Sequence, residues 1–245
     1  MSMTVDTTRD RSVLIVASNP ATSTQTGWPI GFWWSELTHP YWTLTEAGYH
    51  VDVASPDGGA LIGDAYSDPT DPSGYSADDL LSLGFMTSPV SRALTEQSTP
   101  LASVDPTDYD AVLVIGGQGP MITFYNDERV HQLVASNYEA GRITAAICHG
   151  TCVLLKARKA DGTLVVDGKT WTGFANSEED YADQAAGVKI QPFRIEDQAR
   201  ALPNTNFVVQ GRFRAHAIRD GNLITGQQQY SGAAAARLII EAVGR

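Results

Sequence analysis

Short apolar runs rich in β-branched residues alternate along this chain with segments in which apolar residues recur at helical spacing. The apolar runs predict strands buried on both faces, at residues 11–17, 50–54, 111–115 and 143–147. The segments around them predict helices at residues 39–48, 126–141, 148–155, 176–185 and 231–243. This alternation is typical of an α/β fold with a mostly parallel sheet and helices on both faces.

Turn signals in the second half of the chain predict shorter strands. Asp167-Gly168 separates residues 164–166 from residues 169–171, which is the pattern of a β-hairpin. Further short strands are predicted at residues 207–210, 215–218 and 223–224. We therefore expect a small antiparallel addition near Asp167.

The stretch from Pro56 to Pro106 differs from the rest, because it holds six prolines together with many Ser and Asp residues. Helical patches are predicted only at residues 77–83 and 89–96. We interpret residues 56–106 as an inserted, mostly irregular segment that covers one end of the sheet, within one domain spanning residues 1–245. The sequence leaves open whether this segment moves as a lid.

Composition narrows the class of protein. The 245 residues carry a formal net charge of -11 without a cluster of Lys and Arg, so nucleic acid is not an expected partner. No run approaches the roughly 18 apolar residues of a membrane helix. Residues 1–11 are polar and lack the apolar core of a signal peptide, so we expect a cytoplasmic protein.

The two cysteines, Cys148 and Cys152, lie four residues apart. This spacing matches neither the redox C-x-x-C motif nor a zinc framework, and one pair does not make a disulfide scaffold. We expect no metal and no organic cofactor. Cys152 is interpreted as a core residue one helical turn beyond Cys148.

Cys148 stands where a buried strand runs into a helix, with His149 beside it. The small neighbours Ala146 and Gly150 resemble the flanks of the nucleophile turn in α/β hydrolases, which needs small residues on either side. At a helix N-terminus, the dipole and free amides favour a thiolate and lower the thiol pKa. The alternative is an inert buried cysteine, but this local context favours a nucleophile.

A glycine-rich turn follows another predicted strand, at residues 116–119. Glycine lets backbone amides approach a ligand, so the amides of Gly117 and His149 could form an oxyanion hole. Gln118 lies in the same turn and is a candidate binding residue. The alternative is a plain turn. It is no phosphate loop, because the Lys and Ser/Thr of that motif are missing.

Several motifs in consistent order resemble the DJ/PfpI superfamily, which has the class I glutamine amidotransferase-like fold. They are AAICHG at residues 145–150, VIGG at 114–117 and GYHVDVASP at 48–56. Three more resemble its branch of heat-shock chaperones that act as glyoxalase III: GFWWSELTHP at 31–40, TGFANSEE at 172–179 and DGNLITGQ at 220–227.

The resemblance implies a flavodoxin-like sandwich, usually a homodimer, that converts methylglyoxal to lactate without glutathione, metal or organic cofactor. This is the D-lactate dehydratase type of lyase, which works through a cysteine hemithioacetal. In this family, Cys148 corresponds to the nucleophile and His149 to the general acid/base. Glu36 matches the acid that hydrogen-bonds the nucleophile, and Glu179 the acid that orients the histidine. Gly117 and His149 match the oxyanion amides.

Alternatives stay open for the two acids and for the tryptophans. Glu36 could be a solvated residue before a helix, and Glu178 could replace Glu179 as the acid of the triad. Tryptophans crowd the sequence around Glu36 and could line an apolar pocket or a dimer contact. They are Trp28, Trp33, Trp34 and Trp42.

The chain departs from the branch pattern at two places near the expected pocket. Gln118 stands where histidine is common, and the segment from Gln228 to Ser231 stands where Asn-Pro-Ala-Ser is common. Two alternative functions therefore stay open. One is a cysteine hydrolase or amidase with the same residues, and the other is a non-enzymatic stress chaperone or cysteine redox sensor.

Overall fold

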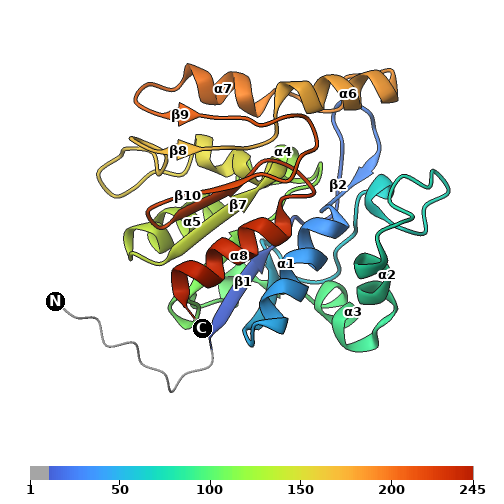
Figure 1. The fold of residues 1–245 in the computed structure, drawn as a ribbon, viewed down its shortest axis with the longest axis horizontal. Helices are drawn as coiled ribbons and strands as arrows, with labels where there is room; N and C mark the ends of the chain where they lie inside the picture. The colour runs from blue at the N-terminus through green and yellow to red at the C-terminus, as the bar shows by residue number, and fades with distance from the viewer. Residues whose placement is uncertain (1–10, 245) are drawn as a thin grey trace.

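The computed structural model describes residues 11–244 and folds them around a seven-stranded sheet (Figure 1). The strand order is β10 (Ala217–Asp220), β11 (Leu223–Gly226), β7 (Ile143–Ile147), β6 (Ala111–Val114), β1 (Ser12–Val16), β4 (His50–Ser55) and β5 (Thr99–Pro100). Every neighbouring pair is parallel except β10 and β11. The predicted α/β fold is thereby confirmed, and so are the four predicted central strands.

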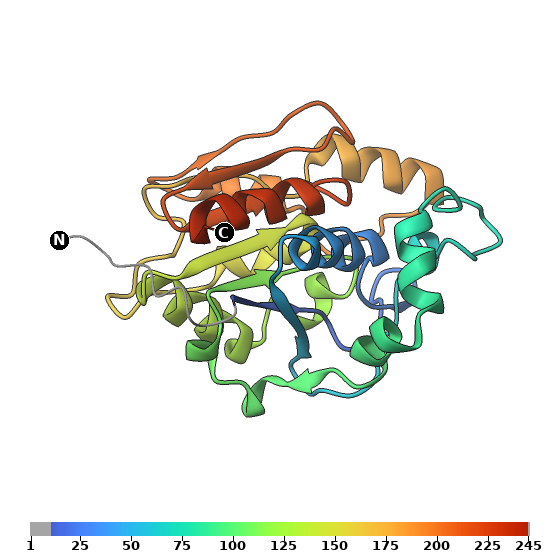
Figure 2. The same cartoon turned by 60° about the horizontal axis from the view of Figure 1, so that its bottom comes forward.

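Helices cover both faces of the sheet, and the residues of the central strands are therefore buried on both sides. Figure 2 shows α1 (Trp34–Glu46) beside α8 (Gly232–Val243) over one face. Val13 and Ile15 of β1 pack toward these two helices, whereas Leu14 and Val16 pack into the opposite layer. That layer contains α4 (Pro120–Thr123), α5 (Glu128–Glu139), the 3₁₀ helix η4 (Cys148–Leu155) and α7 (Ile195–Ala201).

The first helix begins five residues before its predicted start at His39, and Pro40 lies inside it. Proline in a helix interior removes one backbone hydrogen bond, and for this reason the sequence predicts that the helix starts at His39-Pro40. Burial of Leu37 and Leu44 against the sheet stabilises the longer helix. Among the described residues, no helix is long and apolar enough to cross a membrane.

The predicted hairpin at Asp167-Gly168 is wrong. Its second arm forms β8 (Thr170–Trp171), which pairs in parallel with the distant β9 (Asn206–Phe207). The Asp220 carboxylate accepts the backbone N–H of Thr170 at 2.8 Å, which draws this arm away from residues 164–166. The antiparallel addition to the sheet is instead the β10–β11 hairpin, which turns at Asp220-Gly221.

Residues 56–106 are more regular than predicted. They contain α2 (Leu80–Thr87), α3 (Pro89–Glu96), the edge strand β5 and the 3₁₀ helices η1 (Ala65–Ser67) and η2 (Leu101–Ser103). The patch at 89–96 is confirmed as α3, whereas the patch predicted at 77–83 begins three residues later. Beyond the predicted elements, the structure adds β2 (Ala21–Thr22), β3 (Pro29–Ile30) and η3 (Pro106–Asp108), and the helix predicted at residues 176–185 is confirmed as α6 (Asn176–Ala186). The polar segment 1–10 lies outside the described residues.

Leu113 is fully buried in the central strand β6, and we predict that Leu113→Ala lowers the free energy of unfolding by about 2–5 kcal/mol, because it leaves a cavity. Urea denaturation measures the change. Leu80→Ala is the matched control, since the Leu80 side chain is 72% exposed, and we expect it to change stability by less than about 0.5 kcal/mol. Equal losses in both variants would contradict this placement of the core.

Candidate active site

Cys148 stands directly after β7 at the first position of η4. Its φ of 55° is a left-handed conformation, which is rare for a residue with a side chain and typical of a strained turn at a functional site. Gly150 lies so close to β6 that an added methyl group would come within 2.7 Å of the Val114 and Ile115 carbonyl oxygens. The predicted sharp turn between strand and helix is therefore present.

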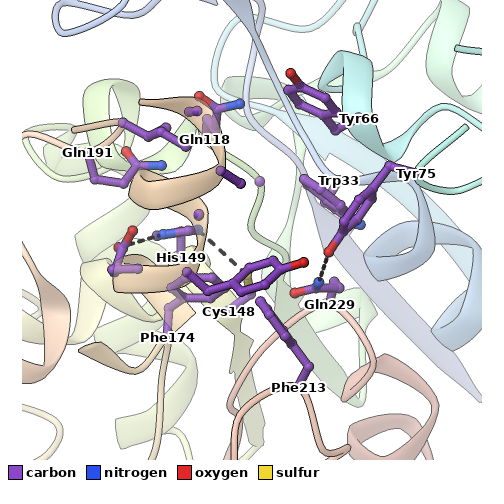
Figure 3. A pocket seen from close by; sticks show the side chains of 17 residues that line it. Trp33, Tyr66, Tyr75, Gln118, Cys148, His149, Phe174, Gln191, Phe213 and Gln229 are labelled. Carbon is purple, nitrogen blue, oxygen red and sulfur yellow. Dashed lines mark hydrogen bonds and ion pairs between the residues drawn. The ribbon is translucent and has the colours of Figure 1, made fainter. Parts of the chain in front are cut away.

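His149 connects the sulfur to a carboxylate. Its Nδ1 lies 3.6 Å from Cys148 Sγ, and its Nε2 lies 3.0 Å from Glu179 Oε1 (Figure 3). Burial disfavours the charged imidazole, but Glu179 outweighs burial, so the pKa of His149 is raised above its ordinary value. The ring of Phe174 stacks on the imidazole at 4.1 Å and limits its rotation. Cys148, His149 and Glu179 are thus connected in the order that a nucleophile, a base and an orienting acid would require.

Glu36, in the first turn of α1, is fully buried beside Cys148 and is not the solvated residue considered as the alternative. Its Oε2 accepts the N–H of Gly116 at 2.8 Å. No partner with ordinary hydrogen-bond geometry reaches its Oε1, but the carboxyl group interacts with the Cys148 thiol. Burial raises the pKa of Glu36 to about 8, so this carboxyl is protonated at neutral pH.

The helix dipole predicts that the pKa of the Cys148 thiol is lowered, and this prediction is wrong. The Cys148 side chain is only 2% exposed, and burial raises the pKa of the thiol, with the Glu36 carboxyl adding to the rise. The backbone amides of His149 and Gly117 act in the opposite direction but do not compensate. A neutral Glu36 does not repel the sulfur, so protonation of Glu36 is the condition under which a thiolate can form here.

Gly117 and Gln118 have different positions relative to the sulfur. The N–H groups of Gly117 and His149 both interact with Cys148 and lower the pKa of its thiol, so both lie close to the sulfur. Their role as oxyanion amides stays a prediction. The N–H of Gln118 is instead bonded to Asp64 Oδ2 at 2.6 Å. Gln118 therefore contributes its side chain, which lines the cavity above Cys148.

Asp64 is a further acid of the site that was not predicted from the sequence; it comes from the inserted segment and is fully buried. Its two oxygens accept the N–H groups of Gly31 and Gln118 and so connect the segment before α1 to the glycine turn. Burial raises the pKa of Asp64 to about 7. A lone aspartate in an Asp-rich loop carries no sequence signal, and only the fold distinguishes it from its solvated neighbours.

The two neighbouring acids at the start of α6 have distinct partners. Glu179 bonds to His149, whereas Glu178 accepts the N–H groups of Ala175 and Phe213 and the side-chain amide of Gln227. Glu178 thus joins the helix to two loops, and only Glu179 contacts the imidazole. This geometry favours Glu179 as the acid of the triad.

A cavity of about 200 Å³ lies over Cys148 and His149, and its wall is mostly aromatic and apolar. It is lined by Trp33, Tyr66, Tyr75, Gly117, Gln118, Cys148, His149, Phe174, Glu179, Tyr181, Ala182, Ala185, Ala186, Ile190, Gln191, Phe213 and Gln229. Of the four tryptophans near Glu36 in sequence, Trp33 faces this cavity and Trp34 packs on Phe32 in the core. Within residues 11–244, no cluster of three or more His, Cys, Asp or Glu side chains could hold a metal ion.

Comparison with known proteins gives one family. The model of the DJ-1/PfpI family matches residues 31–242. The chain is 26% identical to the probable glutathione-independent glyoxalase hsp3103 of Schizosaccharomyces pombe, over 84% of this chain and 88% of that protein. It is 24% identical to glyoxalase 3 of Candida albicans, over 84% and 87%.

Solved structures agree with the fold. The structure of Francisella tularensis Rapid Encystment Protein 24 KDa superposes with a TM-score of 0.84 at 26% identity, covering 96% of this chain and all of that one. Glyoxalase III from Candida albicans superposes with a TM-score of 0.78 at 22% identity, covering 95% and 97%. Both likenesses extend over nearly the whole chain.

The pKa of Glu36 generates a prediction for stability. Because this pKa rises from 4.5 to about 8 on folding, the folded state binds more protons than the unfolded state between these values. Stability is therefore fully present below about pH 4.5 and falls as the pH rises toward 8. We predict that Glu36→Gln, measured by urea denaturation from pH 5 to 7, reduces this fall by up to about 1.4 kcal/mol per pH unit.

Glu46→Gln is the control for that experiment, because Glu46 lies on the same helix but is exposed. We expect its pH profile to follow the wild type. A Glu36→Gln profile that parallels the wild type would contradict a protonated Glu36.

Proposed function

The chain belongs to the DJ-1/PfpI family, and from this premise we propose that it is a glutathione-independent glyoxalase that converts methylglyoxal to D-lactate. The observation that carries the proposal is the series Cys148–His149–Glu179 at the floor of a cavity, with contacts of 3.6 Å and 3.0 Å. The glyoxalase names of the yeast relatives, which match most of the chain, support the same substrate class.

In the first step, the thiol proton passes to His149 Nδ1 while Sγ bonds to the aldehyde carbon of methylglyoxal. The former carbonyl oxygen becomes an alkoxide near the amides of Gly117 and His149, and it takes up the proton to give a hemithioacetal. The neutral Glu36 contributes a hydrogen-bond donor beside the sulfur rather than a second negative charge.

In the second step, His149 removes the proton from the former aldehyde carbon and returns it to the neighbouring carbon, while the hydroxyl proton of the hemithioacetal passes to the neighbouring carbonyl oxygen. This internal transfer oxidises one carbon and reduces the other, so no external oxidant is needed. The product is a thioester of a 2-hydroxy acid. Water then cleaves the thioester, which releases lactate and restores the Cys148 thiol.

Glu179 has a positioning role in this scheme. Its bond to Nε2 leaves Nδ1 directed at the sulfur and stabilises the imidazolium that forms when His149 holds a proton. The stacked ring of Phe174 keeps the imidazole in that orientation.

The same residues suit acyl transfer, so a cysteine hydrolase or amidase is the second candidate function, and accumulation of an acyl-enzyme with ester probes would distinguish it. A cysteine redox sensor fits less well, because such cysteines are exposed and readily ionised, unlike Cys148. A cytoplasmic location, a homodimer and a single domain over residues 1–245 stay predictions of the sequence.

We predict that the wild type forms lactate from methylglyoxal without glutathione and that Cys148→Ala lowers kcat at least about 100-fold, since the nucleophile is lost. Lactate formation is followed by chiral chromatography. Cys152→Ala is the matched control, because this second thiol is buried in the core, where it bonds the Pro120 carbonyl. Undiminished lactate from Cys148→Ala would defeat the proposal.

Substitutions of the two acids of α6 should affect different properties, kcat for Glu179 and stability for Glu178. We predict that Glu179→Gln lowers kcat at least about tenfold by disturbing the His149 tautomer, with little change in stability. Glu178→Gln should retain most of kcat but lower the free energy of unfolding by about 1–3 kcal/mol, since its amide group would face the N–H of Ala175. The reverse pattern would exchange the roles of the two acids.

A further inference from the structure

The cavity over Cys148 is larger than methylglyoxal requires. A water molecule in the liquid occupies about 30 Å³. Methylglyoxal, with its three carbons and two oxygens, displaces roughly four waters and so fills on the order of 120 Å³. The cavity holds about 200 Å³, so methylglyoxal would leave the part farthest from the sulfur unfilled.

That unfilled part is aromatic. Figure 3 shows Trp33, Tyr66 and Tyr75 on the side of the cavity opposite His149. Trp33 meets Tyr75 edge to face at 6.1 Å, and Tyr75 meets Tyr66 at 6.3 Å, so the three rings support one another. Planar rings in edge-to-face arrangement offer a large rigid surface for an apolar or aromatic group.

The side of the cavity near His149 is polar. Gln118 and Gln191 lie together there in Figure 3, and each side chain is only 9% exposed. Oε1 of Gln118 and Nε2 of Gln191 are buried and have no hydrogen-bond partner within residues 11–244. A buried amide without a partner costs free energy, and a half-turn of the amide presents either its donor or its acceptor to the cavity. The carbonyl oxygens of a ligand could accept from Nε2 of Gln191, and from Nε2 of Gln118 after a half-turn of that amide.

We propose that the preferred substrates are 2-oxoaldehydes with a bulky aromatic or apolar substituent, of the arylglyoxal class, rather than methylglyoxal itself. The substituent occupies the space among Trp33, Tyr66 and Tyr75, and the two oxygens lie on the side of Gln118 and Gln191. This inference rests on the proposed function and specifies its substrate class.

The reaction balances as it does for methylglyoxal. Sγ adds to the aldehyde carbon, and one proton moves from that carbon to its neighbour through His149 while the hydroxyl proton passes to the neighbouring oxygen. One water then cleaves the thioester. The substrate R–CO–CHO and water give R–CHOH–COOH. Only the substituent R changes, and it takes part in no bond-making step.

Steady-state kinetics with phenylglyoxal and methylglyoxal test the proposal on the wild-type protein. We expect kcat/KM for phenylglyoxal to exceed that for methylglyoxal at least tenfold, mainly through a lower KM, because the ring is bound in both the ground state and the transition state. Equal values, or a preference for methylglyoxal, would overturn the inference and leave the glyoxalase proposal standing.

A cavity-filling variant locates the effect. Ala182 on α6 lines the cavity, and Ala182→Leu places three further carbon atoms in it. We expect the ratio of kcat/KM for phenylglyoxal to that for methylglyoxal to fall at least tenfold. Ala93→Leu is the matched control, because Ala93 is exposed on α3 away from the cavity, and it should leave the ratio unchanged. An unchanged ratio in Ala182→Leu would contradict the placement of the substituent.

Binding without turnover separates this inference from the proposed function. Mandelate and lactate are the 2-hydroxy acids expected from phenylglyoxal and methylglyoxal, and calorimetry gives their affinities directly. We expect mandelate to bind at least tenfold more tightly. If neither aldehyde is turned over, the glyoxalase proposal fails, and tighter mandelate binding would still support the ligand class. Equal affinities would overturn it.

Discussion

The site depends on one buried imidazole that is surrounded by acidic groups. Glu179 bonds to His149 directly, while Glu36, Asp64 and the Cys148 thiol lie fully buried around it. Buried charges are tolerated when they are paired, and one imidazolium can pair with only one anion. Burial is the main reason why the pKa of Glu36 lies near 8 and that of Asp64 near 7, because it disfavours their charged forms. A thiolate can form only as His149 takes its proton, so the nucleophile is generated together with its counter-ion.

The sheet brings these groups together from distant parts of the chain. Cys148 follows β7 and the glycine turn follows the neighbouring β6, so both lie at the same edge of the sheet. Gly116 has no side chain there because an added methyl would meet Glu36, Cys148 and the His149 amide, all within 3.0 Å. Asp64 of the inserted segment then bonds the amide that follows this turn. The inserted segment is thereby part of the support of the site as well as its cover.

The parts of this arrangement that local sequence encodes could be predicted, and the parts that tertiary burial decides could not. The turn at Cys148 was predictable because a strand, small flanks and an adjoining histidine are contiguous. Glu36 and Glu179 came from resemblance, since a single glutamate carries little signal. The direction of the shift in the Cys148 pKa was predicted wrongly. The helix dipole is a local feature that the sequence shows, whereas burial by α1 and the glycine turn depends on the tertiary fold. The hairpin predicted at Asp167 is wrong for the same reason. The residue that binds β8 is Asp220, which lies more than fifty residues from Asp167 in the sequence.

Chemistry and selectivity are carried by different parts of the fold. The proposed nucleophile, its base and the proposed oxyanion amides lie at the sheet edge and on turns where even a methyl group does not fit, as at Gly116 and Gly150. The wall opposite His149 comes from the segment around Tyr66 and Tyr75, and alanines of α6 also line the cavity. Substitutions in the first group alter the reaction, whereas those in the second change the volume and polarity that a substrate meets. Gln118 joins the two groups, since its backbone is fixed by Asp64 while its side chain faces the ligand. A departure from the family pattern at this position can therefore change substrate selection without displacing the oxyanion amide of Gly117.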